Sequence, residues 1–104
     1  MGIYNTFGQK GVQLKVGKLQ MAHYDIGNYV DKIKDGTYLA PDGAVTICGG
    51  KVVAIFDKVH DKWGNELDLH EIVEKNNPIG IVVKELSKKH VKVRIGETKK
   101  LRRP

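Results

Sequence analysis

The stretch AVTICGGKVVAIF, residues 44–56, decides the fold class of this chain. Two runs rich in β-branched residues, 44–48 and 51–56, lie on either side of Gly49 and Gly50. Two glycines between such runs predict a β-hairpin, because glycine enters tight-turn conformations without a Cβ penalty. A hairpin at the middle of the chain makes β-structure the starting expectation for the residues around it.

Alternation of side chains between the two faces of a strand predicts which hairpin residues lie together. Val45 and Ile47 are expected to share one face of the first strand. Val52, Ala54 and Phe56 are expected to share one face of its partner. The hairpin should therefore present an apolar face to a core.

Shorter runs elsewhere predict more strands. Residues 37–40 lie between an Asp-Gly and a Pro-Asp-Gly sequence, both typical of tight turns. Residues 12–16 alternate apolar and polar side chains between two glycines, and 19–21 could extend the same sheet. Residues 24–30 suggest a loop with aromatic anchors.

The end of the chain predicts a second hairpin. Residues 79–86 form a mostly apolar run, 87–89 are polar enough to turn, and 90–95 alternate cleanly. The alternation would direct one set of side chains inward and a cationic set outward. The inward set is Val91, Val93 and Ile95, and the outward set is His90, Lys92 and Arg94.

One segment has the pattern of a short helix. Asp68 and Glu71 have the spacing of a capping box, in which side chains satisfy the free amides of the first turn. The sequence Asn-Asn-Pro at 76–78 would end the helix, since proline disfavours helical geometry in the residue before it. The apolar stripe consists of Leu69, Ile72 and Val73.

These elements predict a mainly β protein with one short inserted helix. Several short strands joined by glycine-rich turns in 104 residues are typical of a small SH3-like or Greek-key barrel or sandwich. We expect residues 1–96 to form a single β-rich domain and residues 97–104 to be a basic, flexible tail.

The net charge of +6 is concentrated near one end of the sequence. Residues 1–78 carry nine Lys or Arg against ten Asp or Glu, whereas 79–104 carry nine against two. Such a one-sided field attracts anionic partners, namely a nucleic acid, a nucleotide-type ligand or an acidic protein surface. The alternative interpretation is that these cations keep a sheet edge and a tail in solution.

A nucleic-acid site also needs aromatic side chains on which bases can stack. The basic last quarter contains none, so the fold would have to bring in Trp63, Tyr38 or Tyr24. Trp63 could equally pin its loop to the core, since an indole buries a large apolar surface. The predicted binding residues are Lys88, Lys89, Lys92, Arg94, Lys99, Lys100, Arg102, Arg103 and Trp63.

The chain shows no catalytic motif. Its histidines have no spacing typical of a metal site, and Cys48 has no sequence partner that would activate it as a nucleophile. We therefore expect no enzyme activity, no cofactor and no metal. A small hydrolase whose site is assembled by the fold from Cys48, His60 and His70 is the alternative.

The sequence predicts a cytoplasmic protein. No apolar run approaches the ~20 residues of a membrane span. The first residues lack the basic and apolar regions of a secretory signal, and a single cysteine cannot form an intrachain disulfide.

Two stretches, 2–17 and 61–64, resemble small accessory proteins encoded by bacteriophages and prophages. They read GIYNTFG and VQLKVG in the first stretch and DKWG in the second. The resemblance implies a short viral protein of the host cytoplasm that acts by binding, for instance as a host-defence antagonist. The alternative is a virion structural or assembly protein that forms symmetric homo-oligomers.

Overall fold

The computed structural model describes residues 3–75, 79–88 and 91–96. The predicted tail 97–104 and the predicted helix stop at 76–78 lie outside these residues. Within them, the elements follow in the order β1 (Asn5–Phe7), β2 (Val12–Leu14), β3 (His23–Tyr24), β4 (Gly36–Ala40), β5 (Gly43–Cys48), β6 (Lys51–Phe56), β7 (Lys58–Asp61), α1 (Leu69–Lys75), β8 (Ile81–Val82), α2 (Val83–Lys88) and β9 (Val93–Gly96).

The predicted hairpin is confirmed as β5 and β6. Gly49 and Gly50 form its turn with φ of 64° and 76°, which is the left-handed region that glycine enters freely. The residues Pro41 and Asp42 join β4 to β5 in a second tight turn, with Ala40 opposite Gly43. The resulting central sheet has the order β6-β5-β4-β8.

A β-bulge corrects the predicted faces of β6. Ile47 pairs with Val52 and Thr46 with Ala54, so Val53 is an extra residue in the ladder. The bulge shifts the alternation by one position, which buries Val52 and Ile55 together and leaves Val53 exposed. The prediction that Val52, Ala54 and Phe56 share a face was wrong for this reason.

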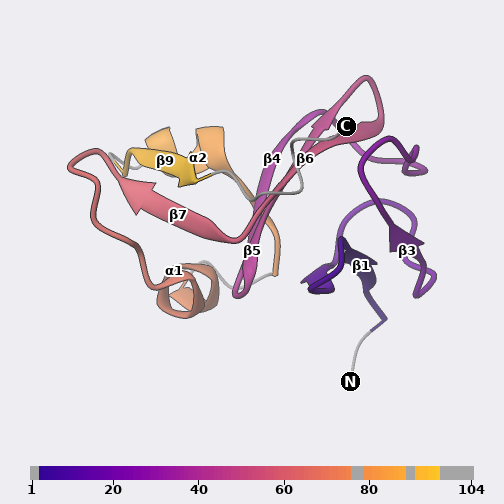
Figure 1. The fold of residues 1–104 in the computed structure, drawn as a ribbon, viewed down its shortest axis with the longest axis horizontal. Coiled ribbons are helices and arrows are strands. Elements are labelled where there is room, and N and C mark those ends of the chain that lie inside the picture. Colours follow the sequence, from indigo (N-terminus) through magenta and orange to yellow (C-terminus); the bar gives the residue numbers. More distant parts are fainter. Residues whose placement is uncertain (1–2, 76–78, 89–90, 97–104) are drawn as a thin grey trace.

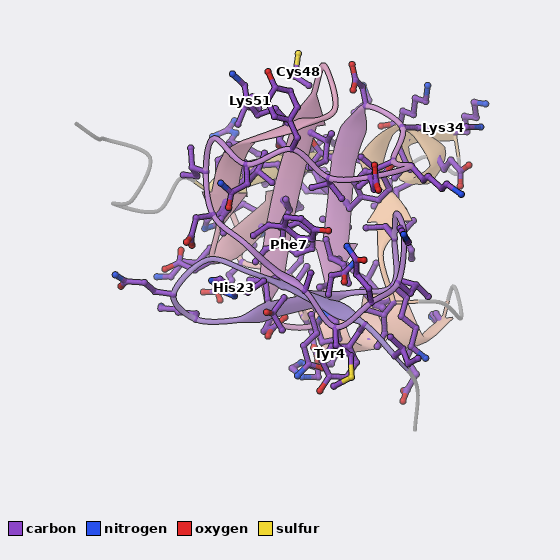
Figure 2. All side chains as sticks on the ribbon, turned by 90° about the vertical axis from the view of Figure 1, so that its right-hand side faces the viewer. Tyr4, Phe7, His23, Lys34, Cys48 and Lys51 are labelled. Carbon is purple, nitrogen blue, oxygen red and sulfur yellow. The ribbon has the colours of Figure 1, made fainter. Side chains whose placement is uncertain are left out.

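The central sheet has a hydrophobic core on each face (Figure 1). On one face lies the N-terminal layer, a small sheet of order β2-β1-β3. Phe7 of this layer is fully buried and its ring stacks on Tyr24 with 5.3 Å between centroids, over the central strands in Figure 2. On the other face lies the C-terminal layer, which consists of β7, β9, α1 and α2.

Buried Asn5 organises the N-terminal layer. Its side-chain amide donates to the carbonyls of Val16 and Lys18, both at 3.1 Å. Its side-chain oxygen accepts from the amides of Gln20 and Ala22. These bonds fold residues 16–22 into a loop, so the predicted strand extension at 19–21 was wrong and the strand that follows is β3.

The predicted C-terminal hairpin was also wrong. Its first strand is only the two-residue β8, after which the chain turns into α2. Its second strand, β9, pairs antiparallel with β7 rather than with β8. Leu86 is only 2% exposed, so α2 buries one apolar residue while Lys and Glu, both good helix formers, face solvent.

The mainly β class is confirmed, and the described residues contain two helices instead of one. Among the described residues, the three sheets are open and none closes into a barrel. The predicted helix is confirmed as α1: Asp68 Oδ1 accepts from the amides of His70 and Glu71, and Leu69 and Val73 are buried.

Candidate functional site

Trp63 lies at the tip of a tight turn that follows β7. The amide of Gly64 donates to the carbonyl of Asp61, and the amide of Asp61 donates to the carbonyl of Asn65. Gly64 has a φ of 91°, which is the left-handed residue expected after a type I turn in a three-residue hairpin loop. Backbone hydrogen bonds therefore join the residues before Trp63 to the residues after it.

The Asp61 side chain stabilises the same turn with further hydrogen bonds. Asp61 Oδ1 accepts from the amides of Trp63 and Asn65, both at 2.9 Å. The hydrogen bond from the Asn65 amide is the largest cause that holds the pKa of the Asp61 carboxyl below its usual value, with desolvation acting in the opposite direction. The ionised carboxylate is thus the form that stabilises the turn.

The indole of Trp63 is directed away from the core. Its exposed fraction is 74%, so the interpretation that Trp63 pins its loop to the core was wrong. The ammonium of Lys62 lies 4.6 Å from the centroid of the Trp63 ring, a cation–π arrangement. An exposed indole on a closed turn is a typical recognition side chain.

A groove of about 400 Å³ lies beside this turn. It forms because β7 and β9 pair with Asp61 opposite Val93, which places the turn next to the residues that lead into β9. The end of α2 supplies the third side. The lining residues are Asp61, Lys62, Trp63, Ser87, Val91 and Lys92.

The lysines and arginine in and next to the groove are exposed, and none forms an ion pair with another described residue. Lys62, Lys88, Lys92 and Arg94 are all exposed. The ion pairs present in the described part of the chain lie elsewhere and involve none of these four side chains. We call Trp63 and these four residues the Trp63 surface. It combines one aromatic ring with four cations available to an anion.

The structure brings together part of the predicted binding set. Trp63 and Lys92 line one groove, Lys88 follows the groove residue Ser87, and Arg94 lies two residues beyond Lys92. The cations are carried by α2 and β9 rather than by the hairpin that the sequence predicted. Lys89, Lys99, Lys100, Arg102 and Arg103 lie outside the described residues.

Sequence reasoning missed four residues of the groove, namely Asp61, Lys62, Ser87 and Val91. Lys62 belongs to the nearly neutral first 78 residues, and the charge count along the sequence selected cations only from the last quarter. The sequence Asp61-Lys62-Trp63-Gly64-Asn65 contained a usable indication, because Asp at the first turn position and Gly at the fourth are typical of this turn. Such a turn places the two residues between them at its tip.

The three residues proposed for a hydrolase site belong to three different elements, β5, β7 and α1. Cys48 is exposed at the end of β5, opposite Lys51 at the hairpin tip (Figure 2). His60 lies in β7 opposite Arg94, and His70 lies beside Asp68 in the first turn of α1. Within the described residues, no group of three or more His, Cys, Asp or Glu is placed to hold a metal ion.

A hydroxyl, an imidazole and a carboxylate do meet in the N-terminal layer. Thr6 Oγ1 and His23 Nδ1 are 2.9 Å apart, and His23 Nε2 lies 3.3 Å from Asp25 Oδ1. Both hydrogen bonds form when His23 carries its proton on Nε2, so that Thr6 donates to Nδ1. Because Thr6 and His23 are partners in the parallel pair of β1 and β3, this chain of bonds links the two strands.

Tyr29 and Lys51 repeat the arrangement of Trp63 and Lys62 at another place. Tyr29 is 71% exposed, and the Lys51 ammonium lies 5.6 Å from its ring centroid. This pair belongs to the edge of the central sheet, where Tyr29 and Lys51 form a backbone bridge. It provides a matched control for the role of Trp63.

Comparison of the chain with protein-family models, curated proteins and solved structures finds no match. Neither α1 nor α2, the helices of the described residues, is long and apolar enough to cross a membrane.

Proposed function

We propose that the protein is a non-enzymatic binding module that engages an anionic partner through the Trp63 surface. The observation that carries this proposal is that Lys62 and Lys92 line one groove with the exposed indole of Trp63. Lys88 and Arg94 follow the groove residues Ser87 and Lys92 in the chain, and none of the four cations is in an ion pair among the described residues. Cations without carboxylate partners keep their full attraction for a ligand. The basic residues of 97–104 add to the same charge.

Phosphate groups are the anions that suit this surface best. Lysine and arginine bind phosphate through charge-assisted hydrogen bonds, and Ser87 adds a hydroxyl at the groove. Binding of this kind releases counterions from a polyanion, so that affinity falls as salt rises. A steep salt dependence is therefore the expected property of the complex.

The test compares matched charge variants. Lys92→Ser with Arg94→Ser removes two cations of the Trp63 surface, whereas Lys15→Ser with Lys32→Ser removes two exposed lysines elsewhere. Binding of a labelled oligonucleotide and of heparin is measured between about 50 and 200 mM salt. The first variant, and deletion of 97–104, should weaken binding and lower the salt slope by about one per lost phosphate contact. Equal binding by all variants, or no binding by the intact protein, would refute the proposal.

For the biological role, we propose a phage-encoded accessory protein or host-defence antagonist that acts in the host cytoplasm. The resemblance of 2–17 and 61–64 to phage accessory proteins supports this role. The alternative is a virion assembly protein, which exposed apolar side chains of the N-terminal layer and its loop, such as Ile3 and Met21, would favour. Light scattering distinguishes the two, since a monomer at high concentration contradicts the assembly role.

A further inference from the structure

We propose that the groove beside Trp63 receives an unpaired nucleobase, so that the anionic partner is single-stranded nucleic acid. This inference rests on the proposed function and narrows its ligand. An anionic partner recognised by charge alone would need the cations but not the indole. The contribution of the Trp63 indole therefore distinguishes a nucleobase from an anion alone.

The position of Trp63 favours stacking. Its ring is exposed, lines the groove, and belongs to a turn that five hydrogen bonds of Asp61 and its neighbours hold in one shape. Preorganisation of this kind lowers the entropy cost of binding. A flat aromatic ligand can therefore stack without the protein first ordering the backbone that carries the ring.

The Lys62 ammonium over the ring does not prevent stacking. An exposed cation–π contact contributes roughly two- to fivefold to an equilibrium, whereas a stacked base contributes about five- to 150-fold. A base can therefore displace Lys62 from the Trp63 ring. The displaced ammonium then becomes available to the phosphate of the same nucleotide.

The groove has the composition that one nucleotide requires. Trp63 and Val91 supply apolar surface for a base, and Ser87, Lys62 and Lys92 supply polar groups for sugar and phosphate. The volume of about 400 Å³ lies within the ~300–1,000 Å³ of small-ligand sites. Within a duplex both faces of a base are covered by its stacked neighbours, so a ligand that stacks on the indole is single-stranded.

The cations continue beyond the groove. Arg94 follows Lys92 by two residues, and the half-buried Val93 between them faces the core. Arg94 and Lys92 thus lie on the outer face at roughly 6.6 Å spacing along the chain. Lys88 adds a charge at the end of α2. More charge than one phosphate needs favours a strand over a free nucleotide.

The experiment uses the intact protein and fluorescence of Trp63, the single tryptophan. Probes are oligothymidylate and oligouridylate of about 12 nucleotides, an abasic strand of the same length, the duplex, and thymidine monophosphate. Both single strands should quench Trp63. The abasic strand should bind at least about fivefold more weakly and leave the emission unchanged.

Variants then test the ring itself, with binding followed through a label on the strand. Trp63→Ala should lose about five- to 150-fold in affinity and Trp63→Phe less. Tyr29→Ala, which removes the matched exposed ring, should bind as the unaltered protein does. Far-ultraviolet circular dichroism of each variant checks that the fold is intact.

The outcomes separate the two proposals. If the abasic strand binds as well as oligothymidylate and Trp63→Ala changes nothing, the nucleobase inference is wrong while charge-based binding stands. If no polyanion binds, both are wrong. If thymidine monophosphate binds as tightly as the 12-nucleotide strand, or the duplex binds better, the assignment to a single strand is overturned.

Discussion

Asp61 Oδ1 accepts a 2.9 Å hydrogen bond from the backbone amide of Trp63, and this bond ties the exposed indole to the strand that presents it. The same oxygen accepts from Asn65, and Asn65 Nδ2 donates to the second oxygen at 3.4 Å. A carboxylate that accepts from several donors is stabilised in its charged form. The shape of the Trp63 surface is therefore linked to ionisation of Asp61.

This link predicts an acid transition in Trp63 emission. Because the folded pKa of Asp61 is lowered from 3.8, its contribution to the turn is complete above about pH 3.8 and is lost as pH falls through the folded value. Emission should stay constant from neutral pH to about pH 4 and change below it. Asp61→Asn keeps a neutral acceptor and should remove the transition, while Asp61→Ala should alter the emission already at neutral pH.

Trp63 emission is the better readout because global stability also depends on Asp35. Asp35 accepts from the amides of Gly49 and Gly50, and these bonds lower its pKa as well. Asp35→Asn should therefore shift acid unfolding but not a Trp63 transition that precedes it. An emission change in Asp61→Asn identical to that of the unaltered protein would contradict the link.

Asn5→Ala should destabilise the protein by about 3 kcal/mol, since it leaves two carbonyls and two amides of the 16–22 loop without their partner. Urea unfolding measures the change. The control is Gln13→Ala on the exposed side of β2, expected within about 0.5 kcal/mol of the parent. Equal effects of the two substitutions would show that the Asn5 bonds do not stabilise the fold.

Gly17 and Gly11 form a matched pair for close packing. Their φ values are 73° and 67°, so the left-handed backbone should destabilise alanine at either position by a similar free energy of about 1–2 kcal/mol. A Cβ at Gly17 would lie 2.8 Å from the Asp31 carbonyl oxygen, whereas a Cβ at Gly11 meets nothing within 4 Å. Thermal unfolding should show Gly17→Ala to be the more destabilising, and the reverse order would contradict the packing described.

A screen for hydrolase activity should be negative, and Thr6 supplies its most informative variant. Thr6, His23 and Asp25 are bonded in the order in which a nucleophile is activated. Thr6→Val removes the hydroxyl and keeps the shape, so any activity that it abolishes belongs to this group. Such a loss would contradict the proposal of a non-enzymatic module.

The parts of the fold that follow from short-range chemistry could be predicted from the sequence. The Gly49-Gly50 turn and the Asp68 cap are decided by a few neighbouring residues, and both are confirmed. The bulge at Val53 could not be predicted, because it depends on how the side chains of β5 and β6 pack into the cores on both faces of the sheet.

The C-terminal error has a physical cause. Residues 79–86 contain apolar residues at spacings that suit both a buried strand and a helix face, and a short apolar run does not distinguish them. The pairing of β9 with β7 joins segments about thirty-five residues apart, which no local pattern specifies.

Of the candidate site, only some of the members could be predicted from the sequence. Trp63, Lys88, Lys92 and Arg94 could be selected by residue type, since cations and an indole are typical of recognition surfaces. Their proximity depends on the pairing of β7 with β9 and on α2, and neither was predicted.

The most direct test of the account is to map where a single strand binds, by following backbone amide and indole resonances of the intact protein as oligothymidylate is added. Binding at the Trp63 surface should shift the resonances of the Trp63 indole and of amides in 61–65, 87–88 and 91–94, with Tyr29 and Lys51 unaffected. Shifts confined to the N-terminal layer or to the Tyr29 region, or no shift at the Trp63 indole, would contradict it.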